Sequence, residues 1–136
     1  TIAQETLTDA SNELQRRFAP KIAEAARQIF ARITGGRYDR LSLAEDLTVH
    51  AGTTDETTLH SALWRSEGTT DQLYLALRLA VAEEVIPQAP LVLDDALVRF
   101  DDTRLAEALR LLQEAAQTRQ VILFTCQNRE KKIMEE

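Results

Sequence analysis

Apolar residues recur at helical spacing through the first part of the chain. Between residues 2 and 34 they fall three, four or seven positions apart, and polar side chains fill the other faces. The set comprises Leu7, Leu14, Phe18, Ile22, Ala25, Ile29 and Ile33. This spacing predicts a helix with one apolar stripe, which is typical both of an ordinary amphipathic helix and of the root of a coiled coil. Pro20 lacks a backbone donor and clashes with the preceding turn, so we expect a kink or break near Ala19.

The pattern changes at residue 35. Gly35 and Gly36 are expected to end the helix, because glycine readily adopts the left-handed conformation of a C-cap. Residues 38–50 alternate between apolar and polar in the manner of a strand. The polar residues 51–60 predict a turn or mobile loop.

The second half of the chain predicts buried helices and strands in alternation. Apolar residues lie on most sides of the helix expected over residues 70–85. The apolar runs 91–93 and 120–125 are typical of strands buried on both faces, and residues 102–118 between them have helical periodicity. Strand, helix and strand in this order predict a right-handed βαβ unit with parallel strands. The expected fold class is therefore α/β, with a mainly parallel sheet, flanking helices and an N-terminal helical arm.

Composition narrows the class of protein. The chain has 136 residues, 44% of them hydrophobic and 28% charged, which suits one small globular domain. Its formal charge of -6 argues against a chain devoted entirely to nucleic-acid binding, although a local basic patch is compatible with it. One cysteine allows no intrachain disulfide and fits a reducing compartment. No apolar run predicts a membrane-spanning helix, and no signal peptide is seen. We interpret the chain, which begins at Thr1 within a helical segment, as a piece of a longer protein.

Two carboxylates follow the apolar run that ends at Leu93. Asp94 and Asp95 would repel each other unless a cation or a proton lay between them. Ligands of open α/β sheets bind at the carboxyl ends of the strands. The pair therefore suits a Walker B motif, whose first acid holds Mg²⁺ while the second orients the attacking water. The structural alternative is a polar strand end whose two aspartates cap a turn.

A serine and a glycine stand just ahead of the long buried helix. Helix N-termini present free N–H groups and a positive dipole end, so they favour phosphate. Gly68 would let a phosphate approach the backbone closely. Taken alone, Ser66 is explained more simply as an N-cap.

Three segments in this order are more specific than any one of them: GTTDQLYLALRLA, LVLDDALVRFDD and VILFTC. Together they resemble the C-terminal lobe of SMC-like and DNA-repair ABC-type ATPases, and most of all the bacterial coiled-coil AAA/SMC-type ATPases. The resemblance covers roughly residues 30–130. It implies the end of a coiled coil over residues 1–34 and a partial ABC-ATPase head over residues 35–136. It also implies ATP and Mg²⁺ as ligands, a homodimer of heads, DNA as a partner, a role in DNA repair or chromosome maintenance, and a cytoplasmic location.

The resemblance also implies roles for individual residues. Ser66 and Gly68 match the signature motif, which in the family contacts the γ-phosphate of ATP held by the opposite subunit. Asp94 matches the Mg²⁺-associated Walker B acid, and Asp95 occupies the position of the catalytic acid. Asp101 matches the D-loop acid, which in the family lies across the dimer interface.

Several positions depart from the family's pattern. Arg65 and Glu67 stand where the signature motif usually has Leu and Gly, and Asp95 is shorter than the usual Glu. Gln127 replaces the switch histidine; its amide can hydrogen-bond a phosphate but cannot take up a proton. These substitutions favour slow hydrolysis or nucleotide-gated binding over fast turnover. Arg104 either stabilises the dimer interface or forms a salt bridge at the start of its helix.

The phosphate-binding loop of such ATPases, G-x-x-x-x-G-K-[ST], does not occur in these 136 residues. In the family this loop and the Q-loop belong to an N-terminal lobe beyond the coiled coil, which is therefore an implied partner. The parent protein is expected to be an ATPase, and this chain alone is expected to be inactive. The second hypothesis is a non-catalytic dimerisation or docking module with degenerate ATPase motifs.

Other chemistry-bearing residues suggest no second site. His50 and His60 have no third ligand nearby in sequence, so we interpret them as exposed loop histidines. An acyl-transfer pair of Ser66 and His60 would lack a nucleophile elbow. Cys126, at the end of a predicted buried strand, is expected to be an inert core thiol. The charged residues 128–136 predict a solvated terminus.

Overall fold

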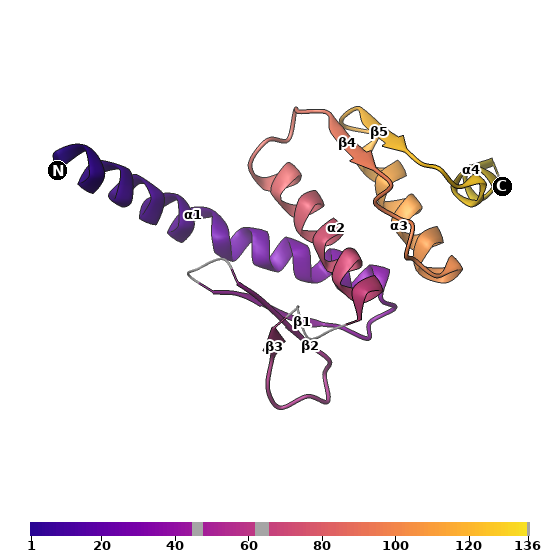
Figure 1. Cartoon of the computed structure of the whole chain (residues 1–136), viewed down its shortest axis with the longest axis horizontal. Coiled ribbons are helices and arrows are strands. Elements are labelled where there is room, and N and C mark those ends of the chain that lie inside the picture. Colours follow the sequence, from indigo (N-terminus) through magenta and orange to yellow (C-terminus); the bar gives the residue numbers. More distant parts are fainter. Residues whose placement is uncertain (45–47, 62–65, 136) are drawn as a thin grey trace.

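The computed structural model describes residues 1–44, 48–61 and 66–135, with the exception of the Leu14 side chain. In chain order the elements are α1 (Ile2–Ile33), β1 (Arg40–Leu43), β2 (Val49–Gly52), β3 (His60–Ser61), α2 (Glu67–Glu84), β4 (Leu91–Asp94), α3 (Asp102–Ala115), β5 (Val121–Phe124) and α4 (Asn128–Glu135) (Figure 1). The predicted α/β class with an N-terminal helical arm is confirmed.

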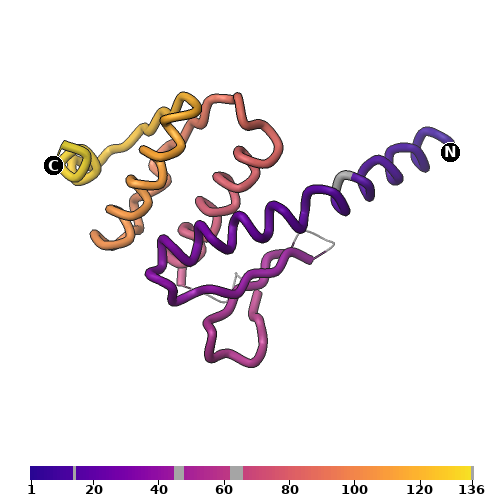
Figure 2. The backbone as a smooth tube through the Cα atoms, turned by 180° about the vertical axis from the view of Figure 1, so that it is seen from behind, coloured from indigo at the N-terminus to yellow at the C-terminus, as the bar shows by residue number. Residues whose placement is uncertain are grey.

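The helix α1 is an arm whose C-terminal half packs on the rest of the molecule while its N-terminal half projects away (Figures 1 and 2). Its described side chains are exposed up to residue 13, whereas Phe30 and Ile33 are buried. The helix continues through Pro20, so the break predicted near Ala19 is absent. One missing hydrogen bond interrupts a long helix less than it would a short one, because propagation is cooperative.

Two glycines end α1 as the sequence predicts. Gly35 and Gly36 have φ of 61° and 80°, which is the left-handed region that side chains with a Cβ seldom enter. The N–H of Gly36 donates to the carbonyl of Ala31 at 2.7 Å, and that of Gly35 donates to Arg32 at 3.2 Å. This pair of bonds is a Schellman motif, and it satisfies carbonyls at the end of the helix.

Three antiparallel strands follow the arm, in the order β1-β2-β3. The prediction of one strand over residues 38–50 is wrong, because the first half of that range forms β1 and its end forms β2. The N–H of Ala44 donates to the carbonyl of Thr48 at 2.9 Å. The loop predicted over residues 51–60 is confirmed for residues 53–59, whereas residues 51–52 belong to β2 and His60 belongs to β3. Leu47, assigned to the single strand, lies outside the described residues. A period of two can continue through a reversal of the chain, so it does not reveal where the reversal lies.

The strands β4 and β5 pair in parallel, with α3 between them in sequence, so the predicted βαβ unit is confirmed. Leu91 and Leu93 are buried on one face of this pair. On the other face Val92 is 54% exposed and Phe124 is 58% exposed. The prediction that both strands are buried on two faces is therefore wrong, because helices of the described chain cover only one of them.

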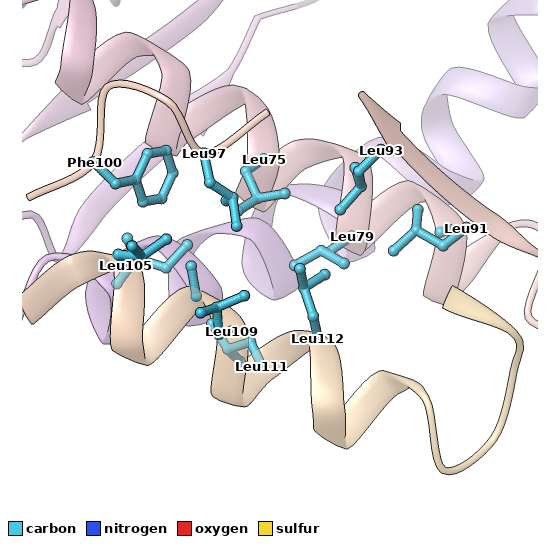
Figure 3. Close-up of a cluster of buried hydrophobic side chains, with 13 residues drawn as sticks. Leu75, Leu79, Leu91, Leu93, Leu97, Phe100, Leu105, Leu109, Leu111 and Leu112 are labelled. Carbon is cyan, nitrogen blue, oxygen red and sulfur yellow. The ribbon is translucent and has the colours of Figure 1, made fainter. Parts of the chain in front are cut away.

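The main core is a layer of leucines between α2, α3 and the covered face of β4 and β5 (Figure 3). Its most buried members include Leu75, Leu93, Leu97, Leu105 and Leu109, each no more than 2% exposed. Burying a leucine side chain stabilises a fold by about 1.5–3 kcal/mol. A second cluster holds the antiparallel sheet against α1 and α2, and it comprises Phe30, Tyr38, Ala51, Leu73 and Ala76.

Arg32, in the last turn of α1, joins the arm to α3. Its guanidinium donates to Oε1 of Glu107 and to both carboxylate oxygens of Glu114, with distances of 2.9 Å to each glutamate. The hydrogen bond from Arg32 lowers the pKa of the Glu114 carboxyl below its ordinary value of 4.5. The arm is thus fixed to α3, the helix that follows β4.

We predict that Arg32→Gln lowers the melting temperature at neutral pH by a few degrees, and that this deficit shrinks in acid. Because Glu114 has a depressed pKa in the folded chain, its contribution is complete above 4.5 and is lost as the pH falls through the folded pKa. Thermal unfolding of both proteins across this range measures the effect. Arg110→Gln is the control, since Arg110 pairs with Glu107 inside α3. An equal pH-dependent deficit in the control would contradict the prediction.

Candidate functional site

The carboxyl ends of β4 and β5 bring the two predicted acids beside the switch segment, residues 125–127. Asp95 directly follows β4, and its N–H donates to the carbonyl of Phe124 at 2.9 Å. In return, the N–H of Cys126 donates to Oδ1 of Asp95 at 2.9 Å. Asp95 has φ of 45°, which is uncommon outside glycine and is better tolerated by Asp and Asn than by most residues. A carboxylate on an uncommon backbone conformation, held by the neighbouring segment, suits a catalytic position.

Asp94 is exposed on the uncovered face of the parallel pair. Alternation along β4 sets its side chain on the same face as Val92, opposite to Leu93. Among the described residues no group of three His, Cys, Asp or Glu side chains is arranged to hold a metal ion. One carboxylate at this position suits Mg²⁺, which commonly takes one or two protein carboxylates together with water and substrate phosphates.

The Cys126 thiol is exposed, so the prediction of a core thiol is wrong. The chain leaves the sheet after Phe124, and Cys126 lies outside the core. A hydrogen bond to Asp95 raises the pKa of the Cys126 thiol, and partial desolvation and the Asp95 charge raise it further. The thiol is therefore a weak nucleophile at neutral pH, for a reason that differs from the one predicted. Gln127 is half-buried, and its N–H donates to Oγ1 of Thr125 at 3.1 Å.

The predicted signature residues Ser66 and Gly68 lie at the start of α2. Ser66 is the N-cap: its Oγ accepts from the N–H of Thr69 at 3.4 Å and lies 2.9 Å from the Thr69 hydroxyl. A Cβ on Gly68 would lie 3.1 Å from the carbonyl oxygen of Arg99, so this glycine permits close backbone packing. The Glu67 carboxylate lies 3.2 Å from the Arg99 guanidinium, which offsets its charge. Arg65 lies outside the described residues.

Asp101, the predicted D-loop acid, is the N-cap of α3. Its Oδ1 accepts from the N–H of Arg104 at 3.0 Å, and its Oδ2 lies 3.2 Å from Nε of the same arginine. Arg104 therefore forms the salt bridge at the helix start that the sequence allowed, and its interface role stays a prediction. The Arg104 side chain also donates to Oε1 of Gln72 at 2.9 Å, and Gln72 is 1% exposed inside α2. This contact joins the N-terminus of α3 to α2.

A groove of about 770 Å³ runs between α2 and the segment that follows β4. Asp94, Asp95 and Arg99 line one end, and Tyr74 and Val81 of α2 are among its apolar residues. Arg99 and Gln72 could not be recognised from the sequence, because a surface arginine and a polar residue in an apolar helix give no motif.

Two expectations outside this site are wrong in part. His50 lies in β2 and His60 in β3, so neither is a loop histidine, although His60 is exposed as predicted. Residues 128–135 form the helix α4, and most of their side chains are at least partly exposed, as predicted for a solvated terminus, but Glu130 is 1% exposed. The Ser66 hydroxyl lies 2.9 Å from that of Thr69, which agrees with the rejection of an acyl-transfer pair with His60. None of the described helices is both long and apolar enough to cross a membrane.

Comparison with known sequences gives one informative relative. The chain is 36% identical over 111 residues to the protein described as "Uncharacterized protein YhaN" of Bacillus subtilis (strain 168). The match covers 79% of this chain but only 11% of the relative's length. No family model matches the chain.

Solved structures of SMC heads share the fold. A structure from work on ATP-driven dimerization and DNA-stimulated activation of SMC ATPases has a TM-score of 0.73 at 22% identity, over 90% of this chain and 77% of that one. The Pyrococcus furiosus Smc head with an extended coiled coil, bound to the C-terminal domain of ScpA, has a TM-score of 0.72 at 21% identity, over 96% and 34% of the two chains. The Thermotoga maritima SMC head domain has a TM-score of 0.61 at 19% identity, over 96% and 44%. The resemblance to the C-terminal lobe of an SMC-like head is thus confirmed at the level of the fold.

We predict that Gly68→Ala destabilises the chain by about 1 kcal/mol, because the new methyl group presses on the Arg99 carbonyl. An unhindered Gly→Ala change in a helix would instead stabilise it by up to about 1 kcal/mol. Urea unfolding of the two proteins measures the difference. Stabilisation by Gly68→Ala would show that α2 and the segment after β4 do not pack this closely.

Proposed function

We propose that the chain is the C-terminal half of an ATP-binding and ATP-hydrolysing SMC-like head. In a head-to-head dimer it would supply the signature segment, the Walker B acids and the D-loop. The observation that carries the proposal is the hydrogen bond from Cys126 N to Asp95, since it would hold the proposed catalytic acid beside the proposed switch segment. Likeness to heads studied for ATP-driven dimerization supports the same function.

Each candidate residue has a role that its position allows. Asp94 would hold Mg²⁺ together with the nucleotide, and the bound ion would neutralise charge on the β- and γ-phosphates. Asp95 would orient the attacking water, and Gln127 would hydrogen-bond the γ-phosphate. Ser66 and the free N–H groups at the start of α2 would contact ATP held by the opposite head, where a helix N-terminus favours an anion.

The local charges suit slow turnover. Glu67 would repel a phosphate, but its pairing with Arg99 at 3.2 Å reduces that repulsion. Gln127 can hold a phosphate and cannot exchange a proton with it. We therefore expect binding and slow hydrolysis of ATP, which suits a nucleotide-gated clamp better than a fast motor.

The exposed apolar faces support an N-terminal lobe of the same protein as partner. Val92 and Phe124 lie on the uncovered face of the parallel pair, at 54% and 58% exposure. On α2, Tyr74 is 54% exposed and Val81 is 39% exposed. Exposed apolar surface of this kind is typical of a place where another part of a protein packs. A lobe that carries the phosphate-binding loop would cover it and complete the nucleotide site.

The wider role follows from the same likeness. The complete protein would use ATP to open or close a DNA-handling assembly in DNA repair or chromosome maintenance, in the cytoplasm. DNA contact would fall to other parts of it, because this chain has a formal charge of -6. The second candidate function is a non-catalytic docking module. The observation that speaks for it is Gln127, which stands where the family has the switch histidine.

We predict that Asp95→Asn in the complete protein preserves ATP binding, slows hydrolysis by about a hundredfold and lets the ATP-bound dimer accumulate. Asparagine tolerates the positive φ and keeps an oxygen for the Cys126 N–H, so only the charge changes. Steady-state hydrolysis and size-exclusion chromatography with ATP measure both effects. Asp55→Asn, in the exposed turn after β2, is the charge-matched control. Unchanged turnover in Asp95→Asn would favour the docking module.

We also predict that this chain on its own self-associates through the open sheet face. The double variant Val92→Thr and Phe124→Gln should weaken association, because it removes the most exposed apolar side chains of that face. Light scattering over a dilution series measures the apparent mass. The variant Ile2→Thr with Leu7→Gln tests the arm instead, where the two side chains are 83% and 71% exposed. A wild-type chain that stays monomeric at high concentration would contradict the prediction.

A further inference from the structure

Arg129, the second residue of α4, binds the turn between the Walker B acids and the D-loop. Its Nη1 donates to the carbonyl of Phe100 at 2.7 Å. Its Nη2 donates to the carbonyls of Val98 at 2.8 Å and Leu97 at 3.1 Å. One guanidinium therefore gathers three carbonyls of a segment that belongs to neither a helix nor a strand. Hydrogen bonds from a charged donor are stronger than those between neutral groups.

A buried carboxylate accompanies this arginine. Glu130 is 1% exposed, and its Oε1 lies 3.8 Å from Nε of Arg129. Within the part of the chain that the structure describes, neither carboxylate oxygen of Glu130 accepts a hydrogen bond, and Nε of Arg129 donates none. The two charges attract more strongly here than they would in water, because few polar groups screen them. Glu130 thus favours the orientation in which the other guanidinium nitrogens face the turn.

The switch segment and the turn are joined at both ends. At one end the Cys126 N–H contacts Asp95, and at the other Arg129 contacts residues 97–100. Gln127 lies between these two contacts, directly before α4. The D-loop cap Asp101 directly follows the bound carbonyls. Displacement of Gln127 would therefore move the backbone that leads into the D-loop.

We propose that Arg129 is a positioning residue that transmits the state of the switch segment to the D-loop. In the proposed function, on which this inference rests, Gln127 reports the γ-phosphate in its own head and Asp101 faces the opposite head. Arg129, oriented by Glu130, couples the position of Gln127 to that of Asp101. The chain would thereby couple nucleotide occupancy of one site to the surface that meets the second head.

Hydrogen–deuterium exchange on the chain tests the contact itself. Arg129→Ala should speed exchange in residues 96–101 by about tenfold while the amides of β4 stay protected. Glu130→Gln, which removes the charge and keeps the shape, should produce a smaller change in the same segment. Lys131→Ala is the matched control, because this neighbouring cation is 75% exposed. If Arg129→Ala fails to fold, Arg129→Lys serves instead, since lysine keeps the charge but cannot reach three carbonyls together. Unchanged exchange over residues 96–101 would overturn the inference.

The complete protein tests the transmission. Arg129→Ala and Arg129→Lys should leave the affinity of a single head for ATP unchanged and weaken ATP-dependent head dimerisation by about tenfold. A variant that only damaged the fold would lower both the affinity for ATP and the dimerisation of the heads. Normal dimerisation of the variants would overturn the transmission role and leave the proposed function intact. A wild-type protein that binds ATP but does not dimerise would overturn the proposed function, and the transmission role with it.

Discussion

Burial of one leucine layer between α2, α3 and a single face of β4 and β5 determines where every candidate residue lies. Leu93 and Leu105 are fully buried in this layer, so the strand and the helix after it are fixed to each other. Because β4 and β5 run parallel, their carboxyl ends meet at the same edge. The N-termini of α2 and α3 reach the same region, as the Gly68–Arg99 packing and the Asp101 cap show. The candidate polar residues are thus held in place by a core that contains none of their side chains.

Much of the fold could be predicted from the sequence, because the hydrophobic periodicity of each helix and strand lies within a short stretch of the chain. The arm, the glycines that end it and the parallel βαβ unit all follow from spacing and chain order. The hairpin of β1 and β2 could not be predicted, since the alternation of residues 38–50 is the same with or without a reversal. The open face at Val92 was missed for a different reason: an apolar run shows what can be buried, and not whether a partner is present.

The candidate site, like the fold, could be predicted only in part. The positions of Asp94, Asp95, Ser66 and Asp101 at strand ends and helix starts could be inferred from their segments. The contacts that connect those segments could not. Arginine side chains make most of them, over separations of about 30 residues, and an arginine that reaches a distant carbonyl leaves no pattern in sequence. The ion pair of Glu67 with Arg99 could not be predicted for the same reason. The hydrogen bond from the Cys126 N–H to Asp95 was equally invisible in the sequence.

Calorimetric titration of Mg-ATP tests most directly whether this chain is half of a nucleotide site. The described residues supply acids, caps and a switch segment, but the sequence has no loop to hold the β- and γ-phosphates. The account predicts no measurable binding to the chain alone, and binding once a lobe with that loop is present. Affinity of about 1 μM for the chain alone, equivalent to about 8 kcal/mol, would contradict it.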